Sequence, residues 1–291
     1  MKNTWLKRGL VALGLLAIWT TLALAAAPPS KPAIVLTAFG TSTEAADTYK
    51  FFEKKVRERF PGYEIHWAYT SKIIRQKLKE ERQIVLKDLS QVLRELKEAG
   101  VSKAAIQSLH IVPGEEWEKK VVAASRQVPG LKVALGEPLL SSRKDRERLV
   151  KALAKMFPRD LGKTAVVVVG HGSPSPRGEK EYVALEELLR SRYGNVFLGV
   201  VEGKPSAQEA LEKVKRSGVS EVLFVPLFFV AGDHMQNDIM GDNPESWKSQ
   251  LLAQKPYVIQ AVPKGLGYHE DIAAIYLDHL SKALMTLEAK R

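Results

Sequence analysis

The sequence predicts an α/β protein of two similar domains, each a parallel sheet flanked by helices, with an active-site cleft between them. Short apolar runs alternate with segments of helical period along the chain, and this alternation favours a parallel sheet with helical crossovers. The second half also repeats the first. Residues 100–117 align without a gap to residues 218–235, and the stretch from Ala33 aligns with the stretch from Ala165, at offsets of 118 and 132 positions.

The first domain is expected to span residues 28–160. It opens with an apolar strand at 33–39, after which Thr41 and Glu44 form a predicted capping box for a helix. The elements expected next are a strand at 63–69, a helix after residue 71, a leucine-striped helix ending at Gly100, and a strand at 104–112. Glu116 follows that last strand, at the edge where parallel sheets usually bind ligands.

The second domain is expected to span residues 161–291, after a linker near 160–163. Its predicted strands are 164–169, 195–201, 222–229 and 257–262. Asn243 and Pro244 are the predicted N-cap and first residue of a helix. A long final helix is striped with apolar residues from Ile272 to Leu287 and is expected to pack on the domains without taking part in chemistry.

Residues 1–27 have the pattern of a secretory signal peptide. Lys2, Lys7 and Arg8 precede an apolar run at 9–24, which ends in small residues. A membrane anchor is the alternative, but the run is shorter than the roughly 20 residues that a span needs. We therefore expect cleavage, export to the periplasm or another compartment outside the cytoplasm, and no stable membrane span after processing.

Composition narrows the classes of ligand. The formal net charge of +11 falls to +8 without the three basic residues of the leader, which suits an acidic small molecule or an anionic surface. Lysines and arginines alternate with acids, as in residues 53–58, so we expect a solvated surface and no nucleic-acid binding. Cysteine is absent, which leaves nitrogen and oxygen ligands for any metal ion.

Three predicted strands of the second half each end in a side chain that can bind a metal: His171, Glu202 and His234. Because the carboxyl ends of parallel strands meet at one edge of a sheet, we expect the three to converge there. The repeat places Glu116 of the first half opposite His234. A strand-end histidine can also be an ordinary polar residue, and His110, inside the predicted strand 104–112, is interpreted as structural, with a ligand or haem role as the alternative.

Several stretches then resemble one family. They are LTAFGTS, YTSKIIRQKL, AIQSLHIVPGEEWEKK, GEPLLSS, GHGS, VVEG, VAGDHMQND and DNPESWK. Together they resemble the anaerobic sirohydrochlorin cobaltochelatases of the CbiK type, within the class II chelatase superfamily, and they extend over essentially the whole chain after the leader. The resemblance implies a chelatase-like fold and metal insertion into a tetrapyrrole.

The resemblance also implies roles for individual residues. His171, Glu202 and His234 would bind the metal, and Glu116, with the two histidines, would assist catalysis by accepting protons from the ring. The substrates would be Co²⁺, with Fe²⁺ or Ni²⁺ as alternatives, and sirohydrochlorin or a related acidic tetrapyrrole. We expect Lys72 and Arg75 to contact that ring. The sequence does not determine the oligomeric state, and a homo-oligomer is one alternative.

The alternative of another class is a periplasmic protein that binds and transports a metal, haem or another tetrapyrrole without turnover. The export signal favours this carrier, whereas Glu116 opposite the metal residues favours the enzyme, because a carrier needs no proton acceptor there. Trp117 and Trp247 are interpreted as packing groups, with stacking on a tetrapyrrole as the alternative. His66, His269 and His279 are assigned to no site.

Overall fold

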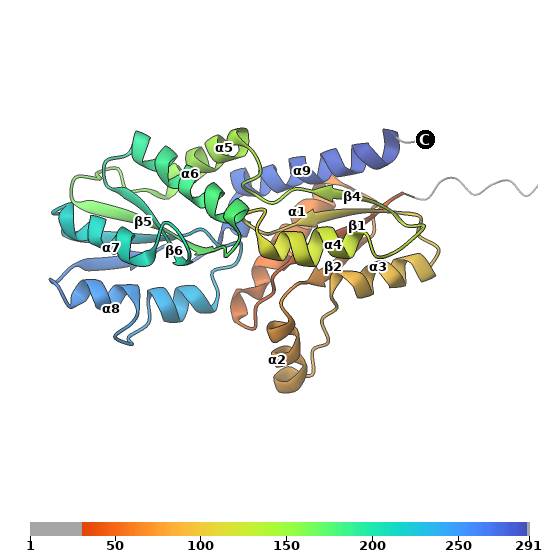
Figure 1. Cartoon of the computed structure of the whole chain (residues 1–291), viewed down its shortest axis with the longest axis horizontal. Coiled ribbons are helices and arrows are strands. Elements are labelled where there is room, and N and C mark those ends of the chain that lie inside the picture. The colour runs from red at the N-terminus through yellow and green to blue at the C-terminus, as the bar shows by residue number, and fades with distance from the viewer. Residues whose placement is uncertain (1–30, 290–291) are drawn as a thin grey trace, which may run out of the picture. The chain divides into compact units, whose positions relative to one another are not determined.

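The computed structural model describes residues 31–289, and the predicted leader lies outside them. The chain forms two four-stranded sheets, and every strand pair in them is parallel (Figure 1). The strand order is β2-β1-β3-β4 in the first sheet and β6-β5-β7-β8 in the second. The strands are β1 (Ala33–Ala38), β2 (Ile65–Tyr69), β3 (Lys103–Ser108), β4 (Lys132–Gly136), β5 (Thr164–Gly172), β6 (Val196–Glu202), β7 (Glu221–Pro226) and β8 (Val258–Ala261).

The duplication seen in the sequence extends to the register of the strands. Ala33 of β1 lies opposite Ala104 of β3, and Ala165 of β5 lies opposite Val222 of β7. The two pairs are related by the same offsets of 132 and 118 positions that align the sequences. The predicted fold class, with two similar parallel sheets, is therefore confirmed.

Helices pack on these sheets, and short π-helices follow β3 and β7. The helices are α1 (Asp47–Arg59), α2 (Lys72–Arg82), α3 (Leu89–Glu98), α4 (Ala123–Ser125), α5 (Arg143–Leu153), α6 (Pro176–Arg192), α7 (Ala207–Arg216), α8 (Trp247–Leu252) and α9 (Glu270–Ala289); the π-helices are Trp117–Val122 and His234–Ile239. No helix among residues 31–289 combines the length and hydropathy that a membrane span requires.

The first sheet is buried on both faces, which explains its uninterrupted apolar strands. Side chains alternate across a strand. Ile34 and Leu36 of β1 therefore pack into one core with Phe52 of α1 and Tyr276 of α9, whereas Val35 packs into another on the opposite face.

The last helix does not remain with the sheet that precedes it in the chain. α9 packs against β3 and β4 of the first sheet, where Figure 1 shows it above β4 and α1. The expected segments 28–160 and 161–291 therefore share a helix: α9 belongs to the second by sequence and covers the sheet of the first.

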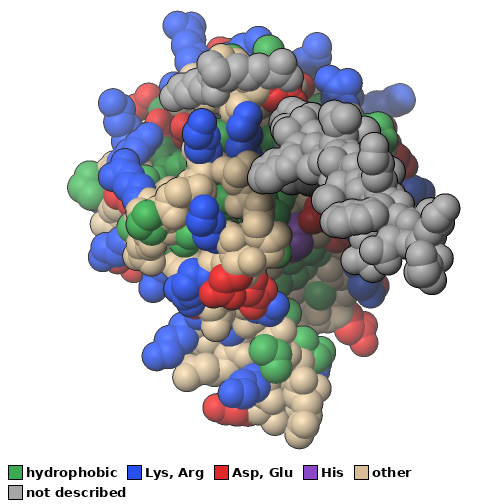
Figure 2. Space-filling view, turned by 90° about the vertical axis from the view of Figure 1, so that its right-hand side faces the viewer, with side chains coloured by type: hydrophobic (Ala, Val, Ile, Leu, Met, Phe, Trp, Pro, Cys, Tyr) green, Lys and Arg blue, Asp and Glu red, His purple; other side chains and the backbone are tan. Residues whose placement is uncertain are grey.

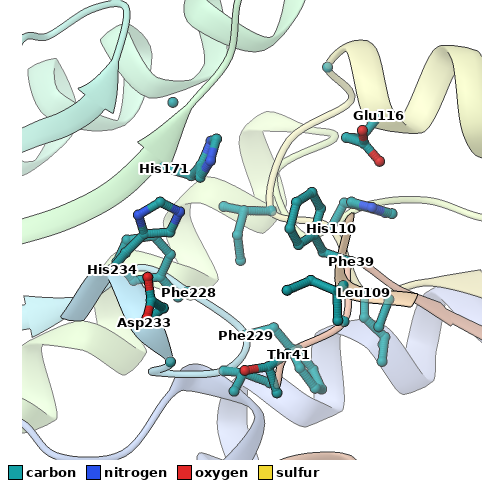
Figure 3. A pocket seen from close by; sticks show the side chains of 18 of the residues that line it. Phe39, Thr41, Leu109, His110, Glu116, His171, Phe228, Phe229, Asp233 and His234 are labelled. Atoms are coloured by element: carbon teal, nitrogen blue, oxygen red, sulfur yellow. The ribbon is translucent and has the colours of Figure 1, made fainter. Parts of the chain in front are cut away.

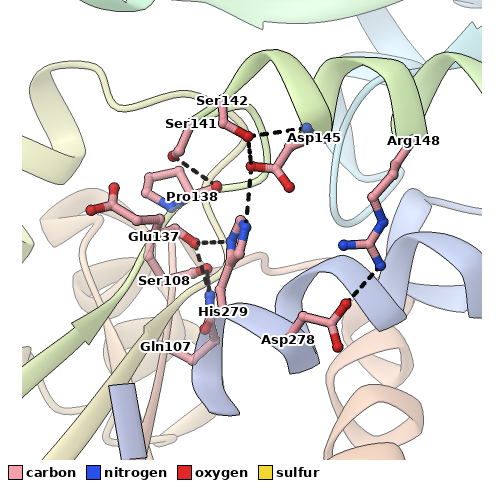
Figure 4. Close-up of polar contacts among 10 residues, drawn as sticks. All are labelled: Gln107, Ser108, Glu137, Pro138, Ser141, Ser142, Asp145, Arg148, Asp278 and His279. Atoms are coloured by element: carbon pink, nitrogen blue, oxygen red, sulfur yellow. Dashed lines mark hydrogen bonds and ion pairs between the residues drawn. The ribbon is translucent and has the colours of Figure 1, made fainter. Parts of the chain in front are cut away.

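A buried polar cluster holds α9 in this place (Figure 4). The ring of His279 lies with Nε2 3.3 Å from Oδ2 of Asp145 on α5 and with Nδ1 2.9 Å from the carbonyl oxygen of Glu137. Nearer the surface, Arg148 of α5 donates to Asp278 of α9 at 2.8 Å. His279, which the sequence assigns to no site, thus has a structural role.

Replacing Asp145 with asparagine should lower stability by about 1–3 kcal/mol, because it disturbs a buried hydrogen-bond network. Burial alone would raise the pKa of Asp145, but hydrogen bonds from His279 and Ser142 outweigh it and hold the pKa below its ordinary value of 3.8. A folded pKa below the unfolded one stabilises the protein above about pH 3.8, and this contribution is lost as the pH falls further.

Thermal unfolding of the parent and of Asp145→Asn between pH 3 and 7 tests this expectation. The difference in stability should shrink below about pH 4. Asp278→Asn is the matched control, since its half-exposed ion pair should contribute at most about 1 kcal/mol. Equal losses in the two variants at pH 7 would contradict the structural role of Asp145.

Two predicted helix starts are wrong. Thr41 does not cap a helix, and its Oγ1 instead accepts a hydrogen bond from the backbone N–H of Thr43 at 3.2 Å. The side chain of Asn243 likewise accepts from the N–H of Glu245, while Ser246 is the N-cap of α8. Short polar side chains form turns as readily as caps, so the local sequence did not distinguish the two.

Two strands are shorter than predicted. The run 104–112 leaves the sheet after Ser108, and the run 222–229 leaves it after Pro226. An apolar run shows burial and does not by itself show an extended ladder. The residues beyond these strand ends contribute to the wall of the cavity described next.

Candidate active site

His171 lies at the end of β5 between two glycines, and both glycines are required by close packing. A Cβ atom on Gly172 would lie 1.7 Å from the carbonyl oxygen of Glu202, and one on Gly170 would lie 2.7 Å from the ring of Tyr182. Gly172 also has a φ of 96°, which glycine adopts without strain. The Gly-His-Gly sequence therefore lets β5 run against β6 and places His171 beside the backbone of Glu202.

His234 is the first residue of the π-helix that follows β7, and π-helical turns are frequent at functional sites. Its ring centroid lies 4.9 Å from that of His171, and its ring stacks on Phe228. On its other side, Nδ1 lies 2.6 Å from Oδ2 of Asp238. Because a carboxylate only accepts, Nδ1 donates to Asp238, which leaves Nε2 of the neutral ring with a free lone pair for a metal ion.

The third predicted ligand, Glu202, lines the same cavity as the two histidines, but its side chain is exposed at the end of β6. In residues 31–289 no group of three or more His, Cys, Asp or Glu side chains is close enough to hold one ion. The structure thus brings His171 and His234 together and does not close the predicted three-residue site.

Glu116 lies one residue before the π-helix of the first half, Trp117–Val122, although the repeat aligns it with His234, the first residue of the second π-helix. In the second half, Asp233 is the residue that immediately precedes the π-helix. Figure 3 shows Glu116 across the cavity from His171 and His234. Its Oε2 is buried and has no hydrogen-bond partner among the described residues. An unpaired buried acceptor is costly, and this one is available to a proton donor in the cavity.

His110 also lines the cavity, although its predicted position inside a strand is wrong: β3 ends two residues before it. Its Nδ1 lies 2.8 Å from Oγ of Ser108, and its Nε2 lies 3.3 Å from Oγ1 of Thr70. Burial lowers the pKa of His110 to about 4. The ring is therefore neutral near pH 7 and exchanges hydrogen bonds with two hydroxyl groups.

The environment of His171 also favours the neutral ring. Burial lowers the pKa of His171 below its ordinary value of 6.5, and the neighbouring His234 lowers it further, against the opposing charges of Glu202 and Glu116. A neutral imidazole is the form that binds a metal ion. His171 is thus ready to act as a ligand near pH 7 without first losing a proton.

The cavity has a volume of about 540 Å³, within the usual range for small-molecule sites. Phe39, Phe228 and Phe229 contribute to its apolar wall. The charged side chains that line it are Glu115, Glu116, Glu202, Asp233 and Lys77. Acidic side chains therefore outnumber basic ones around the cavity, and much of the remaining wall is apolar.

The residues predicted to contact an acidic ring are not those that reach the cavity. Lys72 and Arg75 are absent from its lining. Arg75 instead donates to the carbonyl oxygen of Tyr69 at 2.6 Å, which ties α2 to the end of β2. Trp117 and Trp247 are 3% and 4% exposed and lie in the cores, so their interpretation as packing groups is confirmed.

Sequence reasoning missed Asp238, Lys77 and the cavity position of His110. Asp238 follows His234 by four residues, which is one helical turn, and that spacing was the available signal. For Lys77 no local signal existed, because its place depends on the direction in which α2 leaves the sheet.

The described chain thus combines two parallel α/β lobes with a pair of histidines that line one cavity. The fold matches SirB from Bacillus subtilis with Fe³⁺, with a TM-score of 0.61 and 15% identity over 90% of this chain and 98% of that one. It also matches SirB from Bacillus subtilis subspecies spizizenii in complex with cobalt, with a TM-score of 0.60 and 16% identity over the same shares.

The chain belongs to the cobalt chelatase (CbiK) family, whose profile matches residues 32–285. It is 37% identical over 269 residues to the sirohydrochlorin cobaltochelatase CbiKC of Nitratidesulfovibrio vulgaris, covering 90% of this chain and 93% of that protein. It is 33% identical over 259 residues to the sirohydrochlorin cobaltochelatase of Salmonella typhimurium, covering 87% and 97%.

Proposed function

We propose that this protein inserts Co²⁺ into sirohydrochlorin. The observation that carries the proposal is the pair of histidine rings, 4.9 Å apart, that share one cavity with the opposing Glu116 in a member of the cobalt chelatase family. The cavity thus offers ligands for the ion on one side and a carboxylate that can accept protons on the other.

His171 and His234 hold the ion before transfer, and the exposed side chain of Glu202 turns toward them when the ion arrives. Imidazole and carboxylate ligands suit Co²⁺, and also Fe²⁺ and Ni²⁺. Three protein ligands leave coordination positions open for the ring nitrogens. The ion can therefore exchange its protein ligands for ring nitrogens one at a time.

Insertion also requires two pyrrole N–H protons to leave the ring as the ion forms its bonds to the ring nitrogens. Glu116 accepts a proton on the side of the cavity opposite the ion, through the Oε2 atom that lacks a partner in the described chain. A histidine released by the departing ion accepts the other. The ion thus replaces two protons on the ring nitrogens, and the two protons end on Glu116 and on a histidine.

The direct test uses the purified chain without residues 1–27, sirohydrochlorin, and Co²⁺, Fe²⁺ or Ni²⁺ in turn, followed by absorbance. The enzyme should accelerate formation of the metallated ring well above the spontaneous rate, most of all with Co²⁺. Binding of metal or ring with no acceleration for any of the ions would support the carrier without turnover and overturn the proposal.

Asp238→Asn should weaken Co²⁺ binding and slow insertion by about 10- to 100-fold, because it removes the charge that orients His234. Calorimetric titration with Co²⁺ and steady-state rates measure the two effects. Asp242→Asn is the control, since Asp242 is exposed, pairs with Lys248 and does not line the cavity. The proposed role of Asp238 fails if both variants bind Co²⁺ as the parent does.

Export is part of the proposal. The chain isolated from cells should begin between Ala26 and Pro28, because the short apolar run and the alanines after it fit signal peptidase. N-terminal sequencing of the protein from fractionated cells decides it. An intact Met1 in the cytoplasmic fraction would show that the chain is not exported.

A further inference from the structure

The helix α2 projects from the first lobe (Figure 1), and only Leu78 of its residues is buried. Its start is fixed at two points. The side chain of Ser71 accepts from the N–H of Ile74, and Arg75 donates to the carbonyl oxygen of Tyr69 at 2.6 Å. The helix thus leaves the sheet in a defined direction while most of its surface stays open. Figure 2 shows the projection at the bottom of the molecule, where α2 lies, with basic, acidic and apolar side chains exposed.

One face of α2 borders the cavity, through Ile73, Ile74 and Lys77. Residues three and four apart lie on the same side of a helix, so Lys77 continues the face that the isoleucines begin. Ile74 packs on the turn at Gly40, where an added Cβ would meet it at 3.2 Å. Ile73 is 76% exposed, so an apolar side chain lies open to a ligand at the edge of the cavity.

The charges of the cavity are unequal. Glu115, Glu116, Glu202 and Asp233 line it, and Lys77 is the single lysine or arginine among its lining residues in 31–289. Glu115 pairs with Lys119 on its own helix, whereas no described side chain forms an ion pair with Lys77.

A tetrapyrrole with carboxylates around its rim would be repelled by the four acidic side chains that line this cavity. Like charges brought together at an interface are costly, and opposite charges fix the orientation of the bound partner. The rim carboxylates are therefore favoured at α2, where an unpaired ammonium group lies next to two isoleucines that can cover an apolar ring face.

We propose that Lys77 determines specificity for a carboxylated tetrapyrrole: it binds a rim carboxylate while Ile73 and Ile74 contact the face of the same ring. The inference rests on the proposed function. It adds the place in the cavity where a rim carboxylate binds, which is beside α2. Held in this way, the ring presents its nitrogens toward His171 and His234.

The test compares Lys77→Ala, Lys77→Glu and Lys77→Arg with the control Lys79→Ala. Lys79 lies on the same helix, is exposed and does not line the cavity. Two quantities are measured: the KM for sirohydrochlorin at saturating Co²⁺, and the Kd of uroporphyrin, an octacarboxylate porphyrin, from quenching of tryptophan fluorescence without metal.

Lys77→Ala should raise both constants about tenfold, as expected for loss of one charge-assisted hydrogen bond. Lys77→Glu should raise them further, and Lys77→Arg should restore most of the affinity. The kcat and the affinity for Co²⁺ should change less than about twofold, which also shows that the variants are folded. Lys79→Ala should match the parent.

Parental KM and Kd in Lys77→Ala would overturn the inference, as would a fall in kcat with KM unchanged, which would assign Lys77 to the insertion step. Failure of the proposed function is a separate result. If the parent does not metallate sirohydrochlorin, the Kd of uroporphyrin without metal can still be compared between the Lys77→Ala and Lys79→Ala variants. A parent that binds no uroporphyrin overturns the inference as well.

Discussion

Replacing either His171 or His234 with alanine should abolish stable Co²⁺ binding and reduce the rate of insertion at least about 100-fold. The expectation follows from the geometry, since the two rings lie 4.9 Å apart and no third side chain in residues 31–289 is placed to share one ion with them. With one ring removed, a single imidazole and an exposed carboxylate remain. Removal of a group that only supports a ligand already costs about 10- to 100-fold, and removal of the ligand itself should cost more.

Titration with Co²⁺ and steady-state rates with sirohydrochlorin measure the two effects. His66→Ala is the matched control, because His66 lies on β2 and does not line the cavity. Parental rates in both His171→Ala and His234→Ala, above the spontaneous background, would show that the ion is held elsewhere. Loss of activity in one variant alone would leave a single histidine with the catalytic role.

Glu116→Gln should have the second largest effect, with kcat lowered about 100-fold and Co²⁺ affinity almost unchanged. A general base typically contributes 10²- to 10⁴-fold. Glutamine keeps the size of the side chain and removes its capacity to accept a proton at neutral pH. Because Glu116 lies across the cavity from the histidines (Figure 3), its loss should not disturb how they hold the ion.

Comparison of the histidine variants with Glu116→Gln distinguishes the residues that bind the ion from the residue that accepts protons. Glu118→Gln is the control for Glu116→Gln, since Glu118 lies on the adjoining π-helix and is exposed. A Glu116→Gln protein that binds Co²⁺ poorly would place Glu116 among the metal ligands. One that inserts the ion at the parental rate would show that the histidines, or water, remove both protons.

The sequence by itself determined the two-lobed fold and the positions of its strands. Apolar runs bounded by glycines predicted the two sheets, and the internal repeat predicted that they would correspond, down to the register that places Ala33 opposite Ala104 and Ala165 opposite Val222. The apolar runs are local features of the sequence, and the repeat is found by aligning two of its segments, so neither requires knowledge of the tertiary structure. The same reasoning placed His171 and His234 at one edge, because parallel strands end on the same side of a sheet.

The tertiary structure alone decided which side chains share the cavity. His110 and Lys77 line it while Arg75 does not, because the path of the chain after β3 and the direction of α2 depend on long-range packing. Glu202 ends the predicted strand and lines the same cavity, but among residues 31–289 it does not join the two histidines in a group that could hold one ion.

The tertiary structure also decided where α9 lies. Its apolar stripe predicted only that it would pack on a core. The partners that hold it across the first sheet are far away in the chain: His279 contacts Asp145 and Glu137, more than 130 residues earlier. Periodicity in a sequence shows which face of a helix is buried. It cannot show which of two similar sheets that face will cover, because both present apolar surfaces of the same kind.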